Sequence, residues 1–459
     1  MKQLIYTFSF LLTTSFLFAQ SAQDFYKEGN ELLKSKQYGQ AIEKYSKALA
    51  LDSSFVYAYM NRSRAYSELK KWAAAIKDFD KVLSLEPDNT DALLGRGRSK
   101  FELTYFEGSI LDYTIAIESN DKLINAYYYR GQSLFQVKRY EEALSDFEKV
   151  QELLDVAVDV ATLDYYKDLL MHLGNCQRML RQYDLALLLF DKALEKNPNN
   201  ADIYYNRANA KYSSTRFEDA ILDYSKAIQL NPKHLSAFYY RGMSYRELKQ
   251  YKEAIADFDA VAKMEPKMVL AFVTRGYTYA DMGKYKEALA DYNTALELSP
   301  EDAATFIRRG YIFMETGEYD KAVLDFTKAL TINEAYKPYA LNNRGNAYRL
   351  LKQYDKALED INNSMKIDSL NAWAFMNRAL VYEDQEKYDD AQVDYSRAAE
   401  LNSQLHHIYF HRANFYMIRK QYDKALTDYN KLQELAPDFK TKEVEKNKKI
   451  AKKEFLKGS

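Results

Sequence analysis

Ten arginines recur along the 459-residue chain, and an aspartate follows each of them sixteen residues later. Such charges could bind an acidic ligand through the guanidinium groups, or they could join two helices as ion pairs. Where the pattern changes, both positions change together: Glu28 stands with Lys44, and Leu173 stands with Leu189. We therefore predict contact within each pair, which makes the pairs structural. They are Arg62–Asp78, Arg96–Asp112, Arg130–Asp146, Arg207–Asp223, Arg241–Asp257, Arg275–Asp291, Arg309–Asp325, Arg344–Asp360, Arg378–Asp394 and Arg412–Asp428.

Three histidines, His406, His407 and His411, could do different chemistry. His407 and His411 are four residues apart, so a helix would place both on one face, as metal ligands often are. Neither an HExxH motif nor a cysteine partner accompanies them, and Cys176 is the chain's single cysteine. The sequence also lacks a phosphate-binding loop, a nucleophile elbow and a redox pair. We predict no metal, no cofactor and no catalytic residue, and hence a protein that is not an enzyme.

The composition narrows the class of protein further. Basic residues number 65 and acidic residues 66, a balance that argues against a protein held to nucleic acid by phosphate contacts. Hydrophobic residues make up 47% of the chain, which is too many for a disordered protein. Glycine and proline are scarce, at 14 and 7, and this favours helices over a turn-rich β architecture.

The first twenty residues differ from the rest. Lys2 precedes an uncharged, Leu/Phe-rich segment, and Ala19 and Ala22 offer small residues for cleavage. This layout is typical of a secretory signal peptide (1–20), whereas the apolar segment is short of the roughly 20 residues that a membrane span needs. We therefore expect an exported protein without a transmembrane span after cleavage, located in the periplasm or secreted, most simply in the envelope of a Gram-negative bacterium.

The elements that position the charged pairs follow a repeat. Small residues recur 34 residues apart, apart from one spacing of 43 and one of 35, at Gly29, Ser63, Gly97, Gly131, Gly174, Ala208, Gly242, Gly276, Gly310, Gly345, Ala379 and Ala413. A second small residue follows each after twelve residues, with an aromatic residue three positions before it. Apolar residues between them recur at spacings of three and four, which predicts two amphipathic helices per repeat. Proline closes six of the repeats, as Pro266 does, because it cannot continue a helix.

This pattern resembles the tetratricopeptide repeat (TPR) family: it reproduces the family's period, small residues and aromatic residue in twelve repeats, and the closing proline in six of them. The resemblance implies an all-α fold: a right-handed superhelical solenoid of tandem helix-turn-helix repeats with a C-terminal cap helix. The expected organisation is repeats 1–4 in 22–157, an insertion in 158–166, repeats 5–12 in 167–439 and a basic cap helix in 440–459. The insertion could be a hinge, a homodimer contact or a drifted repeat.

The resemblance also implies a ligand groove lined by the first helix of each repeat. Asparagine can both donate to and accept from a peptide backbone, and tyrosine offers rigid contact area. The alternative is that these side chains are ordinary packing and solvated residues. The candidate peptide-binding residues are Asn61, Tyr128, Asn175, Tyr205, Asn206, Asn209, Tyr239, Asn343, Asn346, Asn377, His407, Phe410, His411 and Asn414.

One clamp known in the family binds a peptide's terminal carboxylate through Lys, Asn and basic residues of three successive repeats. Repeats ten to twelve offer Asn346 and Asn377, followed by His407 and His411, but Asn342 stands where the clamp has Lys. This is half of the clamp, with a possible pH dependence through the histidines. A receptor for chaperone tails is therefore not expected.

We expect an exported scaffold or adaptor that holds protein or peptide partners in its concave groove. The alternative is a structural subunit of a bacterial envelope or secretion assembly, which would use its outer face and its ends. The segment 440–459 has eight lysines and three glutamates, so it predicts a solubilising cap or, alternatively, a peripheral contact with an anionic envelope surface.

Overall fold

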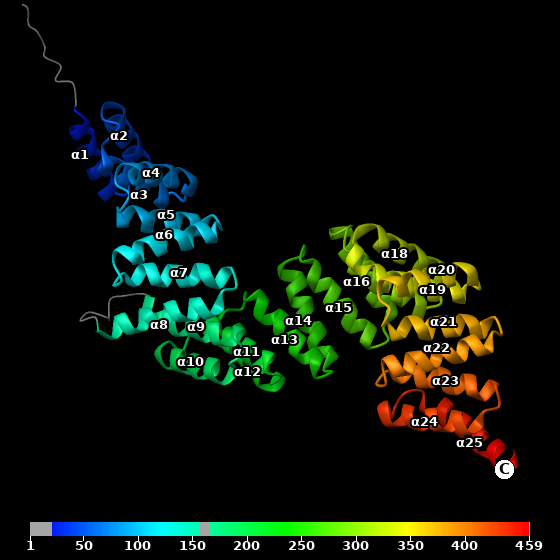
Figure 1. The fold of residues 1–459 in the computed structure, drawn as a ribbon. Helices are drawn as coiled ribbons and strands as arrows, with labels where there is room; N and C mark the ends of the chain where they lie inside the picture. Colours follow the sequence, from blue (N-terminus) through cyan, green and yellow to red (C-terminus); the bar gives the residue numbers. More distant parts are fainter. Residues whose placement is uncertain (1–20, 157–164, 459) are drawn as a thin grey trace, which may run out of the picture. The chain divides into compact units, whose positions relative to one another are not determined.

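The computed structural model describes residues 21–156 and 165–458, without the side chains of 165–167 and 458. The expected signal peptide and nearly all of the expected insertion lie outside these residues. The described chain is all-α (Figure 1). Its helices are α1 (Ala22–Lys34), α2 (Tyr38–Leu51), α3 (Val56–Glu68), α4 (Trp72–Leu85), α5 (Thr90–Glu102), α6 (Phe106–Ser119), α7 (Ile124–Gln136), α8 (Tyr140–Val156), α9 (Tyr165–Met179), α10 (Tyr183–Lys196), α11 (Ala201–Ser213), α12 (Phe217–Leu230), α13 (Leu235–Glu247), α14 (Tyr251–Met264), α15 (Val269–Asp281), α16 (Tyr285–Leu298), α17 (Ala303–Glu315), α18 (Tyr319–Ile332), α19 (Lys337–Leu350), α20 (Tyr354–Ile367), α21 (Ala372–Asp384), α22 (Tyr388–Leu401), α23 (His406–Ile418), α24 (Tyr422–Leu435) and α25 (Thr441–Gly458).

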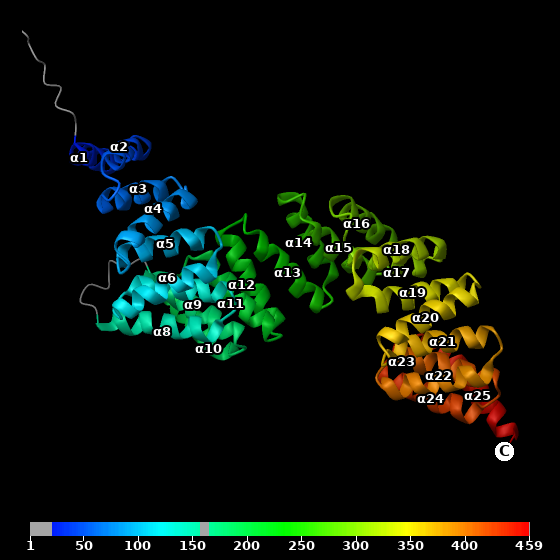
Figure 2. The same ribbon diagram turned by 45° about the horizontal axis from the view of Figure 1, so that its top comes forward.

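Each predicted repeat forms one pair of helices, here called the first and the second helix of the repeat. Within each of the two parts described below, the pairs stack one after another (Figures 1 and 2), so the predicted solenoid of two-helix repeats is confirmed. The chain falls into two compact parts, residues up to Pro232 with repeats one to six, and residues from Lys233 with repeats seven to twelve and α25.

The turn between the two helices of a repeat has the same backbone in all twelve repeats. The second of its three residues takes a positive φ, as Lys36 does at 59° and Gly317 does at 79°. In the first repeat the Gln37 N–H donates to the Leu32 carbonyl and the Lys36 N–H donates to the Leu33 carbonyl, which caps the first helix. Glycine occupies this left-handed position in two repeats only, and the other ten tolerate the strain of a side chain there.

The two helices of a repeat approach closely at the recurring small residue. A Cβ added to Gly310 would lie 2.8 Å from Cε1 of Phe326, a ring that is fully buried. The fully buried alanine twelve residues downstream, Ala322 in this repeat, lies in the same core. In this repeat, the aromatic ring of the second helix therefore occupies the space that a side chain on the first helix would need.

Each of the ten arginines binds its aspartate in a bidentate manner. The Nε–Oδ2 distances run from 2.7 to 3.0 Å and the Nη2–Oδ1 distances from 2.6 to 2.9 Å, always between the two helices of one repeat. In the first repeat, Lys44 and Glu28 form the same contact with the charges reversed. In the fifth repeat, Leu173 and Leu189 belong to one apolar cluster.

The arginines also reach the repeat before them, which the sequence reasoning did not predict. The Nη1 of Arg309 donates to Asn293 Oδ1 at 2.7 Å, and that of Arg96 donates to Asp80 Oδ1 at 2.7 Å. In other repeats a hydroxyl group is the acceptor: the Nη1 of Arg130 donates to the Thr114 hydroxyl at 3.2 Å. Each such guanidinium joins three helices and so fixes the stacking of neighbouring repeats.

One irregularity of the period has a structural counterpart. The extra residue before the tenth repeat falls where a short 3₁₀ helix, η2 (Glu334–Tyr336), leads directly into α19, which has Pro338 in its first turn. The C-terminal helix α25 packs on α24 through Val444 and Ala451, which are fully buried.

None of the described helices is both long enough and apolar enough to cross a membrane.

Candidate peptide-binding groove

The candidate residues of the groove lie on the first helices of the repeats, and several are bonded within the protein. Asn61 donates to Asn30 Oδ1 at 2.8 Å, which links α3 to α1, and Tyr45 donates to the same oxygen at 2.9 Å. Asn209 accepts from Tyr224 at 2.7 Å, and Asn414 accepts from Asn447 of α25 at 3.2 Å. These asparagines therefore already use some of their donors and acceptors in hydrogen bonds between helices.

Four candidate residues are buried, contrary to the expectation that they meet a ligand. Their exposed fractions are 5% for Tyr128, 9% for Tyr239, 3% for Phe410 and 4% for Asn377. Tyr128 bonds His172 at 3.2 Å, Tyr239 bonds Thr274 at 3.1 Å, and Asn377 donates to Asn342 at 3.0 Å. Tyr128, Tyr239 and Asn377 contact a neighbouring first helix, and Phe410 contacts Phe439 and Lys440 before α25, so these residues mainly pack the solenoid together.

Three further candidates lie on α9 and α11. Tyr205 and Asn206 are half-buried, and the Tyr205 ring lies 6.0 Å from the ring of Tyr224. Asn206 donates to the carbonyl of Asp202 in its own helix at 2.8 Å. The Oδ1 of Asn175 is buried and accepts no hydrogen bond from the described residues. No pocket that we identify gathers these three residues together.

Five candidates converge on one cavity in the part from Lys233 onward. This cavity, the amide pocket, has a volume of about 290 Å³ and is lined by Asn343, Asn346, Asn377, His407 and His411. Four successive first helices contribute to its lining: α17, α19, α21 and α23. Apolar side chains such as Met314, Leu350 and Leu380 complete the wall. The pocket thus combines amide donors and acceptors with an apolar lining.

The polar lining of the amide pocket consists mainly of amides and imidazoles, with Arg349 and Glu315 as its charged residues. Burial lowers the pKa of both His407 and His411 to about 4, so both imidazoles are neutral at physiological pH. Arg349 also lines the pocket, but it donates to Asp384 at 2.9 Å and to Asn346 at 3.1 Å. The structure therefore places hydrogen-bonding amides and imidazoles where the family's carboxylate clamp has free cations.

Sequence reasoning missed Trp373 and Arg349 as pocket residues. The Trp373 side chain is 41% exposed, an unusual exposure for so large an aromatic residue, and its ring lies 5.1 Å from that of His407. Trp373 is the second residue of its repeat and Arg349 the twelfth, and both positions border the groove according to the resemblance. Their positions in the repeat could have identified both residues, but the candidates were chosen mainly among asparagines and tyrosines.

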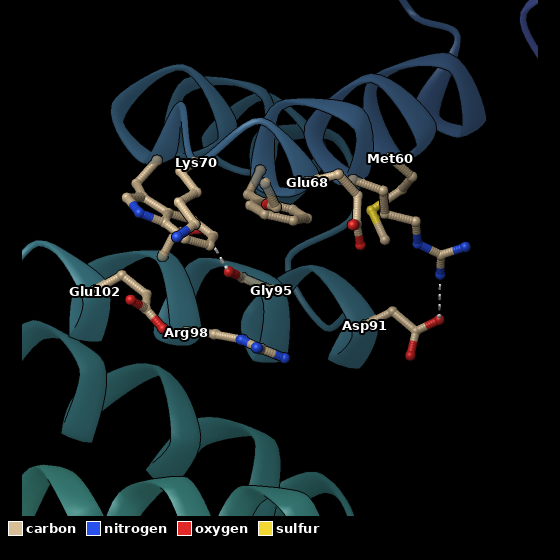
Figure 3. Close-up of a pocket in the computed structure, with 12 residues that line it drawn as sticks. Met60, Glu68, Lys70, Asp91, Gly95, Arg98 and Glu102 are labelled. Atoms are coloured by element: carbon tan, nitrogen blue, oxygen red, sulfur yellow. Dashed lines mark hydrogen bonds and ion pairs between the residues drawn. The ribbon is translucent and has the colours of Figure 1, made fainter. Parts of the chain in front are cut away.

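A second cavity, of about 450 Å³, lies between α3 and α5 in the part up to Pro232. Gly95 lines it and lets the Phe79 ring approach α5 closely, because a Cβ there would stand 2.3 Å from Cζ of that ring. Three acidic and three basic side chains line the cavity, and Arg64 and Asp91 lie 3.8 Å apart. Figure 3 shows that these charged groups surround the cavity, which therefore has a charged rim.

The structure offers no metal centre in the residues that it describes, since no group of three or more His, Cys, Asp or Glu side chains is placed to hold an ion. The rings of His406 and His407 lie tilted against each other and contact Phe439 edge to face, with centroid distances of 4.1 to 5.1 Å. The histidine cluster therefore packs α23 against the segment that leads into α25. The chain's single cysteine, Cys176, is buried.

Stacked two-helix repeats with a groove along their first helices define a class of interaction scaffold. Comparison with protein families finds TPR repeat matches at residues 29–70, 56–89, 124–155, 276–317, 303–336, 338–369, 374–405 and 406–439. Residues 179–261 match the family described as anaphase-promoting complex, cyclosome, subunit 3. The chain belongs to the tetratricopeptide repeat family, and it is a scaffold for protein–protein interaction.

Solved structures with the same kind of fold include yeast Tom70, which is 18% identical over 95% of this chain and 96% of Tom70, with a TM-score of 0.43. The APC/C hetero-tetramer Cut9–Hcn1 is 16% identical over 95% of this chain and 97% of that one, with a TM-score of 0.47. MamA is 23% identical over 35% of this chain and 95% of its own, with a TM-score of 0.34. No curated protein sequence matches the chain significantly.

Proposed function

We propose that this protein is an exported scaffold that holds a peptide segment of a protein partner in the amide pocket. The convergence of the partly exposed Asn343 and Asn346 with Trp373 on one cavity carries the proposal. The amides of Asn343 and Asn346 can pair with peptide groups of an extended ligand, and exposed Trp373 can pack on an uncharged side chain beside them. Neutral His407 and His411 favour an uncharged segment over a terminal carboxylate.

Export and the contact with the envelope rest on the sequence. Residues 1–20 have the layout of a signal peptide, and α25 carries exposed Phe455 and Leu456 among its lysines. Fractionation of the source cells, followed by N-terminal sequencing of the mature protein, tests export directly. A mature chain that begins near Ser21 outside the cytoplasm supports it, and a cytoplasmic chain that begins at Met1 refutes it.

The binding site is tested by crosslinked capture of partners from the cell envelope with the full mature chain. The variant Trp373→Ala with Asn343→Ala removes a largely exposed ring and an amide, and Tyr57→Ala, at a tyrosine that is 69% exposed in the other part, is the matched control. We expect specific partners to disappear with the groove variant and to persist with the control. If the groove variant captures the same partners as the wild type, the alternative of a structural envelope subunit is favoured.

A further inference from the structure

Four tyrosines wall a third cavity, which adjoins the amide pocket. This tyrosine pocket is lined by Tyr277, Tyr285, Tyr292 and Tyr311, has a volume of about 450 Å³, and shares Tyr311 and Asn343 with the amide pocket. Its residues come from α15, α16, α17 and α19, all within the part from Lys233 onward. The two cavities are therefore neighbouring subsites along one groove.

The walls present aromatic faces that remain accessible. Tyr277 is 44% exposed and Tyr311 is 55% exposed, whereas Tyr292 is fully buried at the base. Large exposed aromatic rings on rigid helices offer contact area at a small entropic cost. The rings of Tyr277 and Tyr311 are open to solvent, and Tyr285 and Tyr292 complete the enclosure.

Carboxylates stand beside these rings. Asp281 lines the tyrosine pocket, and Glu315 lines the adjoining amide pocket. Burial raises the pKa of Tyr311 to about 12, and the nearby Glu315 carboxylate and the hydroxyls of Tyr285 and Tyr277 raise it as well. Asp281 already pairs with Arg246 at 3.0 Å, so the Glu315 carboxylate beside the negative face of the Tyr311 ring is the feature that favours a further cation.

The protein itself shows what binds this combination of groups. The guanidinium of Arg246 lies 4.1 Å from the centroid of the Tyr277 ring, and its Nη2 donates to Asp281 Oδ2 at 3.0 Å. Arg246 belongs to the preceding repeat and approaches Tyr277 from outside the pocket's lining. Among the described residues no cation lies over the ring of Tyr285, Tyr292 or Tyr311, and Arg308 lies near Tyr292 at the pocket's lining.

We propose that the tyrosine pocket is a specificity subsite that takes a lysine or arginine side chain of the bound peptide. This inference rests on the proposed function, because it places the basic side chain next to the segment held in the amide pocket. The ring of Tyr311 covers the cation, and Glu315 supplies the compensating charge. Arg308, an exposed cation that also lines the pocket, competes with the ligand for the same negative groups.

The experiment measures small probes on the full mature chain without any partner. The probes are N-acetyl-arginine methylamide and N-acetyl-lysine methylamide, with the citrulline and norleucine analogues as uncharged controls of similar shape. Saturation-transfer NMR at low salt gives their affinities for the wild type and for Tyr311→Leu, Tyr311→Phe, Glu315→Gln and Arg308→Ala. Tyr57→Leu, at an exposed tyrosine in the other part, is the matched control variant.

We expect the cationic probes to bind more tightly than the uncharged ones, with an affinity that falls as salt is added. Tyr311→Leu should weaken them about tenfold, Tyr311→Phe should retain the affinity because the ring remains, and Arg308→Ala should increase it. Equal binding of arginine and citrulline probes would overturn the proposal, and so would an unchanged affinity in Tyr311→Leu. Probe binding involves no partner, so it tests only the tyrosine pocket. Peptide binding in the amide pocket is tested separately, by partner capture with the variant that combines Trp373→Ala and Asn343→Ala.

Discussion

The fifth and the ninth repeats build the same helix pair with different chemistry at the same place. In the ninth, Arg309 binds Asp325 in a bidentate manner and reaches back to Asn293 of the preceding repeat. In the fifth, apolar Leu173 and Leu189 pack instead. The fold therefore requires complementarity at this position rather than charge, in agreement with the near-equivalence of buried ion pairs and well-packed apolar pairs.

The difference lies in how each repeat is joined to the one before it. The fifth repeat has no guanidinium at this position, and His172 occupies the junction. The His172 ring stacks on Phe147 at 5.1 Å and bonds the Tyr128 hydroxyl at 3.2 Å. A guanidinium keeps its charge at any physiological pH, whereas an imidazole does not. The fifth repeat should therefore respond to acid where the ninth does not.

The largest expected effect comes from breaking the ion pair on one side. Arg309→Leu leaves Asp325, whose side chain is 7% exposed, without its cation, and we expect a loss of about 3–5 kcal/mol in the stability of the ninth repeat. Arg309→Leu with Asp325→Leu restores an apolar pair like that of the fifth repeat and should recover most of this loss. Hydrogen exchange of the amides in α17 and α18 measures both variants, and equal protection in the two would contradict the pairing.

Much of the fold could be predicted from the sequence because its determinants are local. Helix pairs, their closing prolines and the arginine–aspartate pairs depend on spacings within one repeat. Accessibility in the groove could not be predicted, because it depends on the neighbouring repeat. Asn343 and Asn377 share one register position, yet Asn377 is buried against Asn342 and Asn343 lines two cavities. The exposure of Trp373 and the backward reach of the arginines have the same origin.

Acid should weaken the fifth repeat and leave the ninth repeat unaffected. Burial lowers the pKa of His172 to about 4 from an ordinary value of 6.5. The stability that neutral His172 contributes is fully present above pH 6.5 and is lost as the pH falls toward 4, by about 1.4 kcal/mol for each pH unit in that interval. Hydrogen exchange of α9 at pH 7 and pH 4.5 should show this loss. In His172→Gln the pH dependence should disappear, and α17 should show none in either protein; a retained dependence in the variant would assign it to other groups.

The close approach at the small residue should be equally important in both repeats. A Cβ on Gly174 or on Gly310 would lie 2.8 Å from Cε1 of Phe190 or Phe326, respectively. We expect Gly174→Ala and Gly310→Ala to cost similar amounts, about 1–3 kcal/mol, because each forces a ring of the core to shift. Denaturant unfolding of the full chain, together with exchange in each repeat, measures the two costs. A loss in one repeat alone would mean that the ion pair, and not the core, decides how closely the helices approach.

The smallest expected effect concerns the turn, where the two repeats again differ. The left-handed position is Arg181 in the fifth repeat, with a φ of 62°, and Gly317 in the ninth, with a φ of 79°. A side chain there costs about 1 kcal/mol, since Cβ crowds the following carbonyl. Arg181→Gly should therefore stabilise the fifth repeat and Gly317→Ala should destabilise the ninth by similar amounts, each read from exchange in the helix that precedes the turn. If Arg181→Gly were destabilising, the greater freedom of glycine in the unfolded chain would outweigh the relieved strain, and the turn would not distinguish the two repeats.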